Sequence, residues 1–97
     1  MRWARLADDL KTAGFDVRVD AQTYPGGVSR SIVCLVKGKG LVSIDDVWWS
    51  KNADVWLGYQ VTAEGADSII IGRPSRPMKN RRETVAMFRL ALANVEG

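Results

Sequence analysis

The sequence predicts an α+β fold: an antiparallel meander sheet of four or five strands, flanked by an N-terminal and a C-terminal helix that both pack on one face. Apolar residues recur at helical spacing only near the two ends of the chain, whereas the middle shows the alternation and β-branched runs that are typical of strands. Short segments, most of which contain glycine, separate the strands, and connections this short join antiparallel neighbours. With 97 residues, 46% hydrophobic and 26% charged, we expect one domain spanning residues 1–97.

The first element is predicted to be an amphipathic helix. Its apolar residues follow one another at intervals of three or four and so share one helical face: Trp3, Leu6, Leu10 and Ala13. Gly14 comes next, at the position where a left-handed C-terminal cap favours glycine. Because neither helix can cover its apolar face alone, we expect both to pack on the sheet.

Two strands are predicted in the first half of the chain. Residues 15–20 alternate apolar and charged side chains, which indicates one buried face. The Tyr-Pro-Gly-Gly run 24–27 favours a turn. The β-branched apolar run 31–36 predicts a central strand buried on both faces, and the Lys-Gly-Lys-Gly run 37–40 turns the chain back. The apolar face of the first strand consists of Phe15, Val17 and Val19.

Residues 41–49 and 55–62 are predicted to form two further strands, joined by a connection at 50–54. Residues 68–71 predict a short last strand. Segment 72–79 contains two prolines, which remove hydrogen-bond donors and fix φ, so neither a helix nor a central strand is expected there.

The last element is predicted to be a second amphipathic helix. Asn80 and Glu83 have the spacing of a capping box, with Asn in place of the usual Ser or Thr. The apolar residues that follow recur at helical intervals: Val85, Phe88, Leu92 and Val95.

The composition excludes several classes of chemistry. The chain has no histidine and one cysteine, Cys34, which removes His-based acid–base catalysis, Ser-His triads, an intramolecular disulfide and Cys/His zinc sites. Cys34 falls in the most apolar strand and is interpreted as a small core residue. No apolar run reaches the roughly 20 residues that cross a bilayer, and residues 1–5 lack the layout of a signal peptide. We therefore expect a cytoplasmic protein with no membrane partner.

No enzymatic site is predicted. The Gly-Lys-Gly run 38–40 is too short for a phosphate-binding P-loop. Four acids could meet around Mg²⁺, as hydrolytic nucleases require, but no Glu-x-Lys motif follows at a suitable spacing. These acids are Asp45, Asp46, Asp54 and Glu64. We therefore predict a protein that is not an enzyme and that holds no cofactor and no metal.

The basic residues are distributed unevenly. The net charge is +3, yet residues 73–97 carry six Arg and Lys against two Glu, whereas residues 1–72 carry eight basic against nine acidic residues. Such asymmetry is typical of a protein that binds nucleic acid or another polyanion, although a solvated connection whose charges aid solubility has the same composition. When the chain is followed through the predicted meander, nine of the fourteen basic residues are expected at one end of the sheet: Arg2, Arg5, Arg30, Lys51, Arg73, Arg76, Lys79, Arg81 and Arg82.

The tryptophans and Tyr24 are predicted at the same end. Trp48 and Trp49 are adjacent and must point to opposite faces of their strand. On the next strand Trp56 belongs to the wetter face, so we expect it to face away from the helices and to pair with Trp48. An exposed pair of this kind can stack bases or anchor a protein interface. Alternatively, a loop or a homodimer covers that face of the sheet.

The order of elements, with basic residues where the last helix begins, resembles that of double-stranded-RNA-binding domains. In that family the start of the last helix contacts phosphates across a groove, which implies this role for Lys79, Arg81 and Arg82. The matching stretch is short. The predicted sheet has at least one strand more than that family, and Glu83 interrupts the basic run.

We therefore predict a small binding module that contacts nucleic acid, either DNA or RNA. The alternative is a protein–protein interaction module, such as an inhibitor or adaptor, that uses the same Trp/Arg patch; the small size also fits an accessory protein of a phage or mobile element. The residues predicted to bind the nucleic acid or the partner are Arg73, Arg76, Lys79, Arg81, Arg82, Lys51, Trp48 and Trp56.

Overall fold

The computed structural model describes residues 2–25, 27–49 and 52–97. Helix α1 (Arg2–Thr12) is followed by strands β1 (Arg18–Tyr24), β2 (Gly27–Val36), β3 (Gly40–Trp49) and β4 (Asn52–Gly65), and then by helix α2 (Arg81–Glu96). The strands form one sheet in the order β1-β2-β3-β4, and each neighbouring pair is antiparallel. The predicted α+β meander is therefore confirmed, with four strands.

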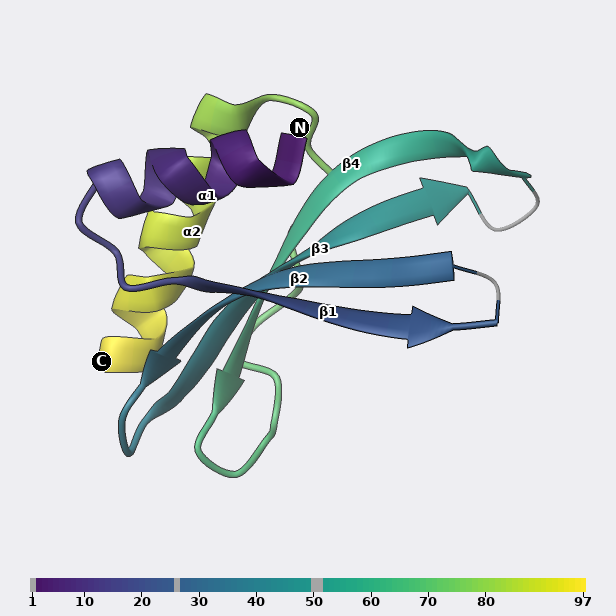
Figure 1. Cartoon of the computed structure of the whole chain (residues 1–97). Helices are drawn as coiled ribbons and strands as arrows, with labels where there is room; N and C mark the ends of the chain where they lie inside the picture. The colour runs from purple at the N-terminus through teal and green to yellow at the C-terminus, as the bar shows by residue number, and fades with distance from the viewer. Residues whose placement is uncertain (1, 26, 50–51) are drawn as a thin grey trace.

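Both helices lie on the same face of the sheet and cover only one end of it. They contact each other, and α2 packs on β4 and β3. Beyond the helices, the β1–β2 and β3–β4 hairpins extend as two arms without helical cover (Figure 1). No helix in the described part of the chain is long and apolar enough to cross a membrane.

The two predicted helix ends have the expected caps. Gly14 adopts φ 96°, and its N–H donates to the carbonyl of Lys11 at 3.0 Å. At the start of α2, Asn80 has an extended backbone and its Oδ1 accepts a hydrogen bond from the N–H of Glu83 at 3.1 Å. Both caps satisfy backbone groups that a helix end otherwise leaves unpaired.

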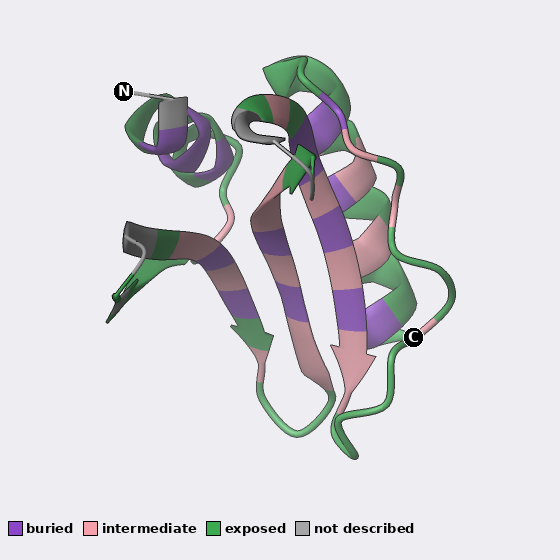
Figure 2. Ribbon diagram, turned by 90° about the vertical axis from the view of Figure 1, so that its right-hand side faces the viewer, coloured by how far each residue is buried: buried purple, intermediate pink, exposed green. Residues whose placement is uncertain are grey.

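The core lies between the helices and one face of the sheet. Buried residues alternate along the strands, as the striped pattern of Figure 2 shows. The side chains of this core that are fully enclosed come from both helices and from the sheet: Leu6 and Leu10 from α1, Ile32, Val42, Ile44 and Tyr59 from the sheet, and Thr84 and Phe88 from α2.

The expectation that residues 31–36 are buried on both faces is wrong. Ile32 and Cys34 are buried, but Leu35 points to the other face and is 57% exposed. The reason is that both helices occupy the same side, so no described element covers the second face. That face also carries polar side chains, among them Ser31, whose hydroxyl donates to the carboxylate of Asp45.

The first strand also differs from its prediction. β1 begins at Arg18 and continues to Tyr24. Val17 is buried, but Val19 is 44% exposed although the alternation predicts it on the apolar face. β1 is the edge strand farthest from β3 and β4, on which α2 packs, and this position leaves Val19 uncovered.

The described chain contains no fifth strand at residues 68–71. Instead, residues 71–79, here called the edge segment, run along the outer edge of β4. The N–H groups of Ile71 and Ser75 donate to β4 carbonyls at 2.8 and 2.9 Å, and Met78 exchanges two hydrogen bonds with the opposite β4 residue. The prolines between them lack donors, so the pairing is interrupted and no regular strand forms.

Candidate functional site

A β-bulge sits where the β3–β4 hairpin leaves the helices. The two strands pair regularly as far as Val47 and Gly58, but the next pair is Trp48 with Trp56, so Leu57 is an extra residue on β4. An extra residue reverses the alternation of side chains beyond it. Trp56 therefore lies on the helix face, and the prediction that it faces away from the helices is wrong. The predicted pairing of Trp48 with Trp56 is confirmed.

Gly58 makes this bulge possible. Its φ is 135°, a conformation that side-chain-bearing residues rarely adopt, and a Cβ atom there would lie 2.6 Å from the backbone of Met78. Only glycine lets β4 and the edge segment approach this closely. A glycine inside a strand pattern often marks a bulge. Gly58 is therefore the signal in the sequence from which the correct face of Trp56 could have been predicted.

Asp46 connects α1, β3 and β4 near the bulge. Its two carboxylate oxygens accept hydrogen bonds from the indole N–H groups of Trp3 and Trp56, both at 2.8 Å. The rings of both tryptophans meet the buried ring of Tyr59 edge to face, with centroids 5.4 and 5.0 Å away. The hydrogen bond to Asp46 and the contact with Tyr59 hold the Trp56 ring against the protein, and its side chain is only partly exposed.

Of the four acids that could have formed a metal site, the three whose side chains are described do not come together. Asp45 and Asp46 lie on opposite faces of β3, and each is engaged by a different partner. Glu64 pairs with Leu41 at the far end of β4, and the side chain of Asp54 lies outside the described residues. Within the described ranges, no group of three acids and cysteines is close enough to bind a metal ion.

The end of the β3–β4 hairpin exposes large apolar side chains. We call this group the hairpin tip, and it comprises Trp48, Trp49, Val55 and Leu57, which are 41%, 49%, 39% and 38% exposed. The tip lies on the arm beyond the helices (Figure 1). Trp49 is absent from the predicted site residues, because the sequence pattern alone assigns it to the buried side.

Four basic residues with exposed side chains and no salt bridge to a described residue follow the outer edge of β4. We call this group the basic edge, and it comprises Arg73, Arg76, Lys79 and Arg82. No acidic group among the described residues lies within salt-bridge distance of these four. The backbone hydrogen bonds of the edge segment hold the first three in a row, and the last follows in the first turn of α2.

Other predicted basic contacts are placed differently. Nε of Arg81 lies 3.4 Å from a carboxylate oxygen of Asp9, so Arg81 joins α2 to α1. Lys51 lies outside the described residues, as do the side chains of Arg2 and Tyr24.

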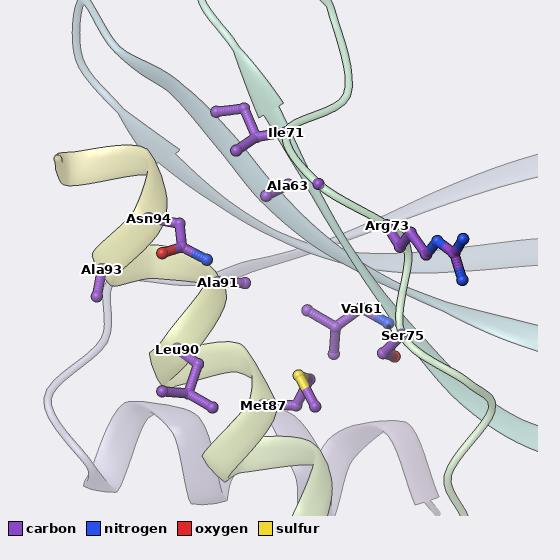
Figure 3. A pocket seen from close by; sticks show the side chains of 11 residues that line it. Val61, Ala63, Ile71, Arg73, Ser75, Met87, Leu90, Ala91, Ala93 and Asn94 are labelled. Carbon is purple, nitrogen blue, oxygen red and sulfur yellow. Dashed lines mark hydrogen bonds between the residues drawn. The ribbon is translucent and has the colours of Figure 1, made fainter.

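Arg73 is the member of the basic edge that lies farthest from the start of α2. It follows Ile71, whose backbone pairs with Ala63 near the end of β4. A cavity of about 340 Å³ opens here between α2 and the edge segment, lined in part by Met87 and Leu90 (Figure 3). The guanidinium of Arg73 points away from α2 (Figure 3). The basic residues thus form a row along β4 and do not gather at one end as predicted.

Cys34 is buried in β2, as expected for a core residue. Burial raises the pKa of its thiol above the ordinary value, and the negative charges of Asp16 and Glu96 act in the same direction. A thiol that resists ionisation is a weak nucleophile.

Comparison with protein-family models, with curated proteins and with solved structures returns no match to this chain. The four-stranded sheet confirms the expected departure from double-stranded-RNA-binding domains.

Proposed function

We propose that this protein is a non-enzymatic nucleic-acid-binding module whose basic edge contacts the sugar–phosphate backbone. The observation that carries the proposal is the row of four exposed cations, Arg73, Arg76, Lys79 and Arg82, with no acidic partner in the described chain. Phosphate contacts by Arg and Lys supply most of the affinity of sequence-independent nucleic-acid binding.

The backbone beneath these side chains supports the proposal. Ile71, Ser75 and Met78 hydrogen-bond to β4, so the cations project from a fixed edge and lose less conformational freedom on binding than cations on a free tail would. Arg82 lies in the first turn of α2, where acidic residues are favoured and a cation opposes the helix dipole. A basic residue at this position contributes nothing to helix stability, and a phosphate ligand gives it a role.

A protein partner is the second candidate, because the hairpin tip exposes two tryptophans beside Val55 and Leu57. Tryptophan is enriched among the residues that dominate the energy of protein interfaces. An inhibitor or adaptor would use the tip as its anchor, and the basic edge would then influence mainly the rate of association.

Charge-removing variants test the first candidate against the second. The test variant replaces Arg76, Lys79 and Arg82 by Gln. The control replaces three exposed cations elsewhere by Gln, so that the net charge is the same: Arg5, Lys11 and Lys37. Binding to fluorescent oligonucleotides is measured at about 50 and 200 mM salt.

We expect the test variant to bind at least about tenfold more weakly than the control at low salt, and with a flatter salt dependence. Equal binding by the two variants would mean that only net charge matters and would refute the proposed contact surface. Nucleic acid and a reducing environment for the single thiol are both found in the cytoplasm, where we propose that the protein acts.

A further inference from the structure

We propose that the ligand of this surface is a single strand, with its backbone along the basic edge and its bases stacked on Trp48 and Trp49 of the hairpin tip. This inference depends on the proposed nucleic-acid function and adds the class of ligand. It depends on three properties of the described residues: the spacing along the edge, the exposure of the tip, and the short path between the two.

The spacing of the basic edge suits one extended strand. Ile71, Ser75 and Met78 lie beside every second residue of β4, which places successive pairings about 7 Å apart. Arg73, Arg76 and Lys79 therefore follow one another at a similar interval. A nucleotide repeat contains six backbone bonds, as two peptide residues do, and it extends over about the same 7 Å. One cation thus falls near each successive phosphate of a strand that runs along the edge.

The hairpin tip offers stacking surfaces that only unpaired bases can use. Trp48 and Trp49 are 41% and 49% exposed, at the end of an arm that no described helix covers. Trp48 shares the face of its cross-strand partner Trp56, whereas Trp49, the next residue on β3, points to the opposite face, so a strand that passes the end of the arm meets one ring on each side. Bases in a duplex already stack on their neighbours, whereas those of a single strand are free to stack on an aromatic ring. The Asp46 hydrogen bond holds Trp56 against Tyr59, so the cross-strand neighbour of Trp48 is a fixed support.

The tip and the basic edge are close enough for one short strand to reach both. Met78, which precedes Lys79, pairs with Tyr59 on β4, and Tyr59 pairs with Asp46 on β3. Two strand spacings across the sheet and two residues along β3 separate Met78 from Trp48, which amounts to roughly 12 Å. About two nucleotide repeats span this distance.

The test compares a fluorescent oligothymidine of about 20 nucleotides, longer than the usual site of such a surface, with a duplex of equal length. We expect tighter binding to the single strand, by about tenfold or more. Trp48→Ala and Trp49→Ala should each weaken single-strand binding by about 5- to 100-fold and leave duplex binding unchanged within about twofold. Trp48→Tyr should restore most of the loss, because a phenol ring also stacks.

Leu57→Ala is the matched control. It removes a side chain of the same patch with similar exposure and no ability to stack, so single-strand binding should change by less than about twofold. The melting temperature of each variant establishes that it is folded before its binding is compared.

The outcomes separate this inference from the function on which it depends. Salt-dependent binding that is equal for single strand and duplex, or that is insensitive to Trp48→Ala and Trp49→Ala, would overturn the single-strand inference and leave the basic edge as a nucleic-acid contact. If Leu57→Ala weakened single-strand binding as much as Trp48→Ala and Trp49→Ala do, base stacking would be overturned as the mode of contact. Binding to neither ligand at low salt would refute the proposed function, and this inference with it.

Discussion

Replacement of Asp46 by alanine is expected to destabilise the protein more than any other exchange of a single acidic residue on the sheet. The carboxylate accepts both indole hydrogen bonds of the Trp3–Trp56–Tyr59 cluster, each at 2.8 Å. A hydrogen bond to a charged group contributes about 1.5–3 kcal/mol. Because the site is half-buried and water can reach part of it, we expect a loss of about 2–4 kcal/mol for Asp46→Ala, a large share of the roughly 5–15 kcal/mol that stabilises a domain.

Two further variants distinguish the loss of the indole hydrogen bonds from the loss of any carboxylate on β3. Asp46→Asn keeps one carbonyl oxygen as an acceptor, so one of the two indole bonds survives and about half of the loss is expected. Asp45→Ala removes the neighbouring carboxylate, which lies on the open face and accepts from the hydroxyl of Ser31. Water can replace that bond, so its loss is expected to cost about 1 kcal/mol or less.

Urea unfolding, followed by tryptophan fluorescence and far-ultraviolet circular dichroism, measures all three variants. We expect midpoints in the order wild type, Asp45→Ala, Asp46→Asn and Asp46→Ala, from most to least stable, with little change in the slope of the transition. If Asp46→Ala costs no more than Asp45→Ala, the aromatic cluster does not join α1 to the sheet in the way described.

The bulge at Gly58 and the thiol of Cys34 can be tested in the same way. Gly58→Ala should cost more than about 3 kcal/mol in a urea titration, because its Cβ meets the Met78 backbone and its φ is 135°. Gly38→Ala, at a positive φ with no atom within 4 Å, should cost only about 1–2 kcal/mol; equal losses would contradict the close approach. Cys34 should react slowly with a thiol reagent at neutral pH and rapidly after unfolding. Because its folded pKa is raised, the native state holds its proton more tightly than the unfolded state. The stabilisation that comes from the protonated Cys34 thiol is therefore present below pH 9.0, the ordinary pKa of this thiol. It is lost as the pH rises through the pKa of the thiol in the folded state. Cys34→Ala should lose less stability than wild type above pH 9.0, and an identical alkaline loss would contradict the raised pKa.

The helices and turns could be predicted from the sequence because their signals are local. Gly14 and Asn80 cap their helices through backbone groups only a few residues away. The periodicity of Phe88, Leu92 and Val95 likewise reports one buried face, and all three are buried.

Which faces of the strands are buried could not be predicted locally, because it depends on how the other elements pack on the sheet. Residues 31–36 have the composition of a doubly covered strand, but cover on the second face requires another layer, which the described elements do not form. Val19 has a strand-like alternation, and its exposure follows from its place at the edge of the sheet. Neither property can be read from a window of neighbouring residues.

The candidate site was predictable in composition and only partly in geometry. The excess of basic residues after position 72 is a property of the sequence, and it indicates Arg73, Arg76, Lys79 and Arg82 as candidate contacts. The pairing of Arg81 with Asp9 joins two helices that are far apart in sequence, so no local pattern reveals it.

The orientation of the tryptophans depends on a single residue. The bulge at Leu57 moves Trp56 to the helix face. A strict alternation of period two cannot include such an extra residue, and only the glycine that follows it indicates the irregularity.

The salt dependence of oligonucleotide binding measures how many phosphates the basic edge contacts. If Arg73, Arg76, Lys79 and Arg82 each neutralise one phosphate of a single strand, the logarithm of the binding constant should fall with the logarithm of salt concentration with a slope of about −3. Replacing Arg76, Lys79 and Arg82 by Gln should reduce the magnitude of that slope by about 2. A slope near zero, or one that the three replacements leave unchanged, would contradict a contact between the basic edge and the phosphates.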